Sequence, residues 1–202
     1  MKNNLPNWKK FSNQLKVGKK AIDFGFLAKD GDVTRVNARY RVAKSFKKIN
    51  LETFSDEVIL GYSGLVKAFL SYSTLEGYIK LLSNKEKISI PLEAESFIDS
   101  SQAKVISEKI LKLDNKKKFY AFIQSYVDRQ NIKKNIDKFY NGEEHNIVSL
   151  LAGVRHIFGH GILSSSSNKI KPKKVNEICN LLSDFILEEI ANDFAKRVDN
   201  VS

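Results

Sequence analysis

The chain has 202 residues and a net charge of +11, and its 42% hydrophobic content provides enough apolar side chains for one hydrophobic core. A single cysteine, Cys179, excludes an intrachain disulfide, and no apolar run approaches the roughly 18 residues that a membrane-spanning helix needs. The N-terminal segment lacks the apolar stretch of a signal peptide, so the composition predicts a soluble, cytoplasmic protein that is not inserted in a membrane.

The first 50 residues form a basic arm, because they hold 13 Lys and Arg against 3 Asp. These cations are interleaved with aromatic residues, namely Trp8, Phe11, Phe24, Phe26, Tyr40 and Phe46. Cations neutralise phosphates and aromatic rings stack on bases, so the mixture favours nucleic-acid binding. The residues expected to contact nucleic acid are Lys9, Lys10, Lys19, Lys20, Arg35, Arg39 and Arg41. The alternative is a basic arm whose aromatic residues pack on the main body.

Within this arm, residues 1–17 are expected to form a short helix. Residues 18–48 contain an Asp-Gly pair between two alternating runs, which is typical of a small β-hairpin. The sequence therefore divides into a basic extension, residues 1–50, and a helical domain, residues 51–202.

From about residue 53 the spacing of apolar residues is helical. Residues 53–82 are expected to form one long helix, which begins with a capping box of Thr53 and Asp56. Further helices are expected at 94–113, at 116–140 with a break near 128–131, at 145–160 and at 172–198. Pro172 suits the first turn of the last helix, and Gly161 suits the end of the one before it. The pattern predicts an all-α protein, an antiparallel bundle of about five helices.

The core-facing stripes of the last two helices are regular. They comprise Ile147, Leu151, Val154 and Phe158 in the first, and Val175, Ile178, Leu182, Phe185 and Ile190 in the second.

The stretch "VRHIFGHG", residues 154–161, places Arg155, His156 and His160 on an apolar helix. Three interpretations are open. His156 and His160 have the i, i+4 spacing of zinc-binding helices, but position 157 lacks the glutamate of an H-E-x-x-H motif, and no metal or cofactor is expected. The residues could also form an ordinary polar helix face.

The third interpretation is phosphate chemistry. The guanidinium of Arg155 offers a fixed fork of donors to a phosphate, and a histidine such as His160 can transfer a proton near neutral pH. One arginine and one histidine do not supply all the groups that phosphodiester cleavage needs. Two copies of the chain related by a two-fold axis would supply a base, an acid and the cations.

The long helix provides a second indication. Glu76 lies on its apolar stripe, three residues after Ser73 and therefore on the same face. An acid on an apolar stripe is costly unless it is paired, so we expect a salt bridge between Glu76 and Arg155 that holds the guanidinium in place.

The segment "RHIFGH" fits the pattern R-x4-H with a polar residue directly after the arginine. In this motif, and in its place near the end of the penultimate helix, the chain resembles HEPN domains, all-α modules found in many RNase toxins and defence ribonucleases. The segment "YSTLEGY", residues 72–78, is similar to the first core helix of the Apea-like HEPN subset. The resemblance covers about residues 53–198.

The resemblance implies metal-independent cleavage of single-stranded RNA by 2′-OH attack, at a composite site between the subunits of a homodimer. Carried over by position, Arg155 and His160 would be the catalytic residues, with His156, Glu76 and Ser73 in support. A separate antitoxin or a sensor protein would be the partner. The rival hypothesis is a non-catalytic helical module that binds nucleic acid or a protein partner through the basic arm.

Overall fold

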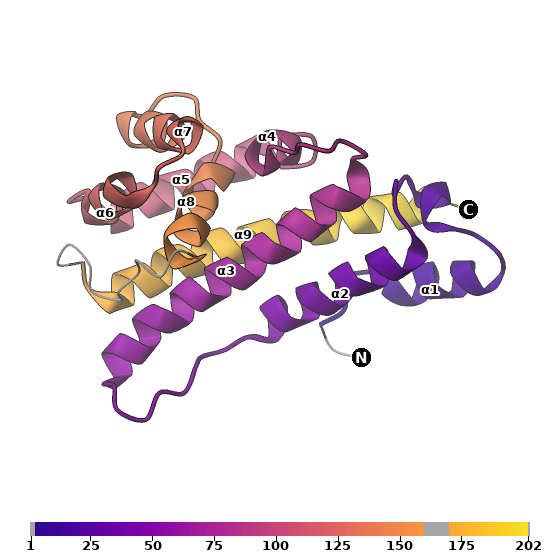
Figure 1. The fold of residues 1–202 in the computed structure, drawn as a ribbon, viewed down its shortest axis with the longest axis horizontal. Coiled ribbons are helices and arrows are strands. Elements are labelled where there is room, and N and C mark those ends of the chain that lie inside the picture. Colours follow the sequence, from indigo (N-terminus) through magenta and orange to yellow (C-terminus); the bar gives the residue numbers. More distant parts are fainter. Residues whose placement is uncertain (1–2, 160–169, 202) are drawn as a thin grey trace.

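The computed structural model describes residues 3–159 and 170–201, and within these residues the protein is entirely helical (Figure 1). The helices are α1 (Trp8–Lys16), α2 (Asp30–Ser45), α3 (Asp56–Leu82), α4 (Ile90–Ala94), α5 (Ser100–Leu113), α6 (Lys118–Tyr126), α7 (Gln130–Asn141), α8 (Val148–Gly159) and α9 (Pro172–Asp199), with a short 3-10 turn at Ala21–Phe24. The all-α prediction is confirmed, although the bundle has more and shorter helices than expected.

The two longest helices, α3 and α9, lie side by side along the molecule and run in the same direction (Figure 1). Near the start of both helices, Asn176 donates a hydrogen bond to the Leu60 carbonyl, and near their ends the Tyr78 hydroxyl donates to Asp193. The expected antiparallel arrangement is therefore wrong for this central pair. Short loops force neighbouring helices to be antiparallel, but α3 and α9 are separated by the whole of α4 to α8.

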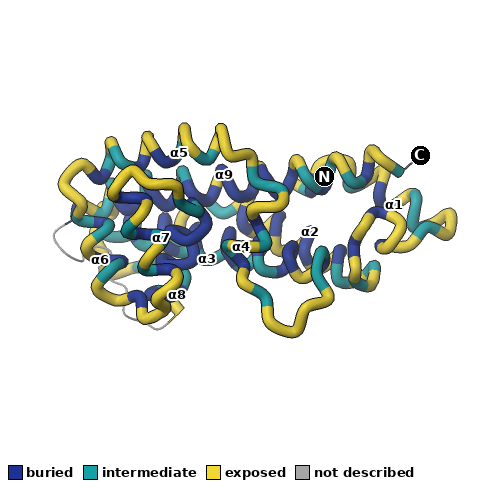
Figure 2. Tube along the Cα trace, turned by 90° about the horizontal axis from the view of Figure 1, so that it is seen from above, coloured by how far each residue is buried: buried dark blue, intermediate teal, exposed yellow. Residues whose placement is uncertain are grey.

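Antiparallel packing is found around this pair. The Leu27 amide donates to the Leu81 carbonyl beside the start of α2, and the Ile49 amide beyond its end donates to Ser63. Helix α2 therefore runs opposite to α3. Figure 2 shows the buried segments concentrated where the helices face one another.

The expected hairpin within residues 18–48 is wrong, because this segment forms the 3-10 turn and α2. Asp32, from the Asp-Gly region, accepts a hydrogen bond from the Lys29 amide and so caps a helix instead of closing a turn. Val33, Val36 and Tyr40 are buried on one face of α2, and their three- and four-residue spacing is helical.

Most of the aromatic residues of the first 50 residues belong to the hydrophobic core or pack against it, and the exception is the half-buried Phe46. Phe11 and Phe26 are fully buried, and their ring centroids lie 5.6 and 5.7 Å from that of Phe194 in α9. Trp8 stacks on the same ring at 6.1 Å. The buried rings of Phe11 and Phe26 stabilise the fold and cannot stack on bases, so that part of the nucleic-acid interpretation is wrong for these two residues.

The expected helix ends differ in detail. The long helix is confirmed, but its N-cap is Ser55, whose hydroxyl accepts from the Val58 amide, and not Thr53. The helix expected at 94–113 begins later, at Ser100, because Asp99 caps the start of α5. The break near 128–131 and the last helix are confirmed. Gly161 lies outside the described residues.

Asp99 makes the start of α5 sensitive to acid. Its carboxylate accepts hydrogen bonds from the Ser101 hydroxyl and from the amides of Ser101 and Gln102, and these bonds lower the pKa of Asp99. A carboxyl group with a lowered pKa stabilises the fold above its unfolded pKa of about 3.9 and loses this effect as pH falls. Asp99→Ala should therefore lower the melting temperature at pH 7, and the difference from wild type should shrink below about pH 4. An equal difference at pH 7 and pH 3 would contradict this role.

One helix among residues 3–159 and 170–201, α3, is long and apolar enough by length and composition to cross a membrane, with a mean hydropathy of 1.2 over 18 residues. Half of that window is buried inside the structure, against α2, α8 and α9. Burial of this kind is what a core helix requires.

Candidate functional site

Helix α8 carries residues 154–159 of the "VRHIFGHG" motif and crosses α3. The two helices are joined by the Phe69 and Phe158 rings, whose centroids are 5.3 Å apart. On its other side α8 approaches α6 and α7 closely at Gly153, where a β-carbon would lie 2.7 Å from Cγ2 of Ile123. These contacts fix the position of Arg155, two residues further along α8.

Arg155 is half-buried, and its guanidinium carbon lies 5.9 Å from the centroid of the Tyr72 ring in α3. This distance is within the range of a cation–π contact, which holds the guanidinium without using its hydrogen-bond donors. No carboxylate pairs with Arg155 in the described part of the chain. The donors of the fork are therefore available to an anion.

Tyr72 is the centre of a small electrostatic cluster. Only 7% of the residue is exposed, and burial raises the pKa of its phenol. The negative charge of Glu76 raises this pKa further, whereas the positive charges of Arg155 and Arg129 lower it. The phenol therefore stays protonated at neutral pH, and charged groups from α3, α8 and the α6–α7 connection meet around it.

The expected salt bridge between Glu76 and Arg155 is not formed, because Glu76 pairs with a different residue. Its carboxylate binds Lys80, one turn along the same helix, at 2.9 Å, and its side chain is 32% exposed. A carboxylate with this much access to solvent does not need a buried partner, so the argument from an apolar stripe fails. Ser73, half-buried on α3, lies beside Tyr72 in the sequence.

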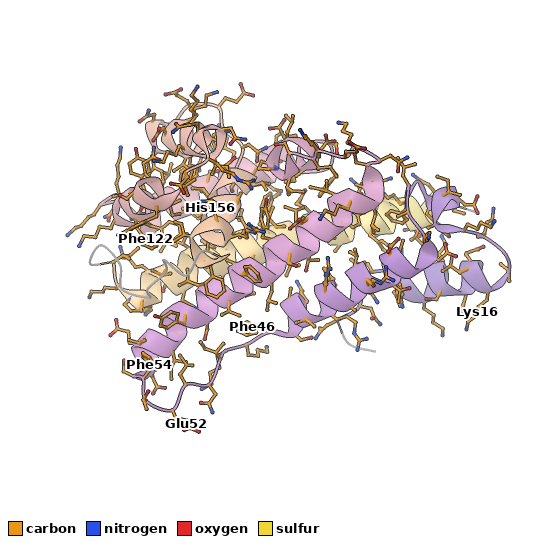
Figure 3. The ribbon with its side chains drawn as sticks, viewed as in Figure 1. Lys16, Phe46, Glu52, Phe54, Phe122 and His156 are labelled. Carbon is orange, nitrogen blue, oxygen red and sulfur yellow. The ribbon has the colours of Figure 1, made fainter. Side chains whose placement is uncertain are left out.

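His156 points away from solvent, with only 7% of the residue exposed (Figure 3). Its Nε2 lies 3.8 Å from a carboxylate oxygen of Asp128, in the connection between α6 and α7. His156 thus contacts the segment that carries Arg129, while Arg155 faces α3. His160, the expected proton-transfer residue, lies outside the described residues.

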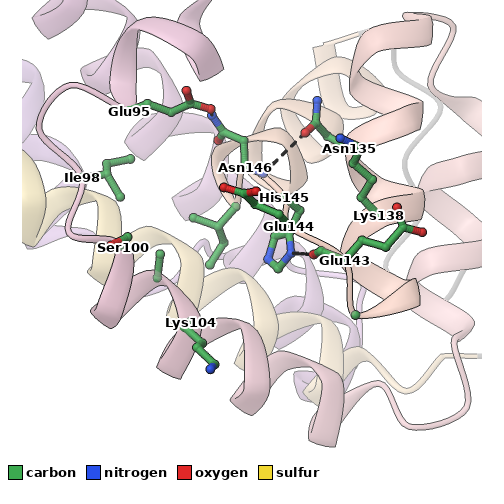
Figure 4. Close-up of a pocket in the computed structure, with 13 residues that line it drawn as sticks. Glu95, Ile98, Ser100, Lys104, Asn135, Lys138, Glu143, Glu144, His145 and Asn146 are labelled. Atoms are coloured by element: carbon green, nitrogen blue, oxygen red, sulfur yellow. Dashed lines mark hydrogen bonds between the residues drawn. The ribbon is translucent and has the colours of Figure 1, made fainter.

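A pocket of about 690 Å³ surrounds the third histidine, His145 (Figure 4). The Nδ1 of His145 donates to the Glu143 carbonyl at 2.8 Å, and its Nε2 lies 2.9 Å from the Ser107 hydroxyl. The charged residues that line this pocket are Glu95, Glu143, Glu144, Lys104 and Lys138. Carboxylates outnumber lysines, which disfavours a phosphate here.

No group of three or more His, Cys, Asp or Glu residues that could hold a metal is found among residues 3–159 and 170–201. A pair of His156 and His160 is not covered by this finding, because His160 lies outside these residues.

The seven cations expected to bind nucleic acid differ in their surroundings. Lys10 pairs with Asp199 at 3.0 Å, and Arg35 pairs with Asp32. Lys19 is half-buried. The others are exposed and make no ion pair with a described residue: Lys9, Lys20, Arg39 and Arg41.

Sequence reasoning missed two members of the cluster. Tyr72 was considered only as the first residue of the "YSTLEGY" segment, and Arg129 lies in the expected break near residues 128–131. The signal for Tyr72 was its spacing of four from Glu76 within "YSTLEGY", which places both on one face of the helix. Nothing local to Arg129 predicts that it would approach α3.

Comparisons with protein-family models, with curated proteins and with solved structures found no match. The resemblance to HEPN domains therefore rests on the R-x4-H motif, the "YSTLEGY" segment and their order in the chain.

Proposed function

We propose that the chain is a metal-independent endoribonuclease of the HEPN type, which cleaves single-stranded RNA at a site shared by two copies of the chain. The observation that carries this proposal is the half-buried guanidinium of Arg155, held over the Tyr72 ring without a carboxylate partner among the described residues. A guanidinium placed in this way offers parallel donors to a phosphate. An internal carboxylate would compete with the substrate for the same donors.

In this mechanism Arg155 binds the scissile phosphate and stabilises the charge that develops on it. One His160 takes the proton of the 2′-OH, whose oxygen attacks the phosphorus as the bond to the 5′ oxygen breaks. The His160 of the second copy gives a proton to the leaving oxygen. The products are a 2′,3′-cyclic phosphate and a 5′-OH.

The supporting residues have different tasks. His156 faces Asp128 and is buried, so it orients the α6–α7 connection and does not contact RNA. Glu76 acts on the cluster through its charge, and Ser73 lies at its edge. A nuclease of this kind has to be restrained in the cytoplasm, and a separate antitoxin or sensor protein is the partner that the proposal assigns to this task.

The test is incubation of the purified chain with a mixed-sequence single-stranded RNA in EDTA, followed by analysis of the RNA ends. Fragments that carry cyclic phosphate and a 5′-OH are the expected products. Cleavage that occurs only when a divalent metal is added would refute the mechanism.

A second function, nucleic-acid binding without cleavage, is favoured by the exposed cations of the first 50 residues. Lys9, Lys20 and Arg41 carry charges that no described carboxylate neutralises. Replacing all three by glutamine should weaken RNA binding and reduce the slope of log K against log salt by up to about 2, since each lost contact to a single strand contributes about 0.7.

The matched control is the double variant Lys10→Gln and Arg35→Gln, which removes cations that already pair with Asp199 and Asp32. We expect it to change the slope much less. An unchanged slope in the triple variant would show that this surface does not bind RNA.

A further inference from the structure

Beside Tyr72 lies a pocket of about 340 Å³, between the residues that lead into α4 and the start of α7. This volume is at the lower end of the range for small-molecule sites, and it is enough for one nucleotide. The Tyr72 ring forms part of its wall, and Arg155 lies over the same ring. The pocket is therefore adjacent to the proposed cleavage site.

The charged residues that line this pocket, Lys87 and Arg129, are both cations. Both are exposed, and neither pairs with a carboxylate in the part of the chain that the structure describes. Like charges that share a pocket repel each other unless an anion lies between them. In this respect the pocket differs from the one around His145, where carboxylates predominate.

Part of the remaining lining is an apolar wall, formed by Ile88, Ile90, Pro91 and Ile132 beside Tyr72. The lining also contains polar groups, among them the side chains of Ser89 and Asn131. An apolar wall with two cations at its edge suits a molecule that is flat and apolar on one side and anionic on the other. A nucleotide unit of single-stranded nucleic acid has this form.

We propose that this pocket binds the nucleotide next to the cleaved bond, with its phosphate on Lys87 and Arg129 and its base against the apolar wall. The inference rests on the proposed function for the position of the cleaved bond, but the binding itself does not require cleavage. The Tyr72 ring separates the two phosphates, one on Arg155 and the next on Lys87 and Arg129. Lys87 and Arg129 are thus binding residues that set the register of the strand.

The experiment measures binding of a fluorescently labelled RNA whose 2′-OH groups are all methylated, so that it cannot be cleaved. The full chain is compared with Lys87→Gln, Arg129→Gln and the double variant. Each substitution should weaken binding about ten-fold, the effect of one lost charged hydrogen bond. The matched control is Lys85→Gln, which removes an exposed lysine that is already paired with Glu93, and it should bind nearly as wild type does.

An abasic strand of the same length tests the apolar wall, because it keeps the phosphates and lacks the bases. It should bind more weakly than the methylated RNA and should still respond to Lys87→Gln. Equal affinity for the two strands would reduce the pocket to a phosphate site and overturn the assignment of a nucleotide.

Failure of this inference and failure of the nuclease proposal give different results. If the wild-type chain binds through Lys87 and Arg129 but leaves ordinary RNA intact, the pocket stands and the nuclease proposal fails. If ordinary RNA is cleaved while Lys87→Gln and Arg129→Gln bind as Lys85→Gln does, the pocket inference fails. Absence of any binding by the wild-type chain would also overturn it.

Discussion

Replacing Arg155 with alanine is expected to lower the rate of RNA cleavage at least about 100-fold, because the guanidinium is the group assigned to the charge on the phosphate. Its side chain is half-buried over Tyr72 and forms no ion pair in the described residues, so little of the fold depends on it. The variant should keep the helical circular dichroism and nearly the melting temperature of wild type. The measurement is a time course of RNA cleavage in EDTA.

Arg155→Lys separates charge from geometry. Lysine keeps the positive charge but lacks the planar fork of two parallel donors, so we expect an intermediate rate. His160→Ala removes the proton-transfer group and should be as inactive as Arg155→Ala. Wild-type rates in either alanine variant, with the fold intact, would eliminate the mechanism.

The largest expected effect on stability comes from Gly64→Ala, at a position where α3 and α9 are in close contact. A β-carbon at this position would lie 2.6 Å from the Cα of Asn176. Because this neighbour is a backbone atom, it cannot change rotamer to make room, so the two longest helices would have to move apart. We expect a loss of about 1–3 kcal/mol in the free energy of unfolding, measured by urea denaturation.

Gly31→Ala is the matched control. Gly31 lies in α2, and nothing lies within 4 Å of the β-carbon that alanine would add. This substitution should leave stability unchanged or raise it by up to about 1 kcal/mol, because alanine favours the helix. If the two variants were equally stable, the close contact between α3 and α9 would not be important for the fold.

The elements that could be predicted from the sequence are those whose signal is local. The apolar stripe of α9, with Val175, Ile178 and Leu182, is buried as expected, and Pro172 begins the helix. The Asp-Gly pair misled because its meaning depends on context. An Asp-Gly pair can close a turn or lie in the first turn of a helix, as Asp30 and Gly31 do, and the burial of Val33 and Val36 decides between these outcomes.

The candidate site was predicted in part. The motif placed Arg155 on a helix beside the core, but its neighbour could not be predicted, because the choice between Glu76 and Tyr72 depends on how α8 crosses α3. The Glu76 carboxylate can pair with Lys80 on its own helix, whereas Tyr72 is buried and its position is fixed. Arg129 and Lys87 lie near Tyr72 only because of tertiary packing, and no local sequence pattern predicts this proximity.

The parallel arrangement of α3 and α9 has a consequence for synthesis on the ribosome. Helix α3 is made early, yet the surface that covers it along its whole length is α9, the last helix of the described chain. Until residues 172–199 have left the exit tunnel, the long apolar helix α3 lacks its main partner. A growing chain therefore has to keep α3 from aggregating, either in its transient contact with α2 or on a chaperone. Chains that end before α9 should therefore be cleared by proteases.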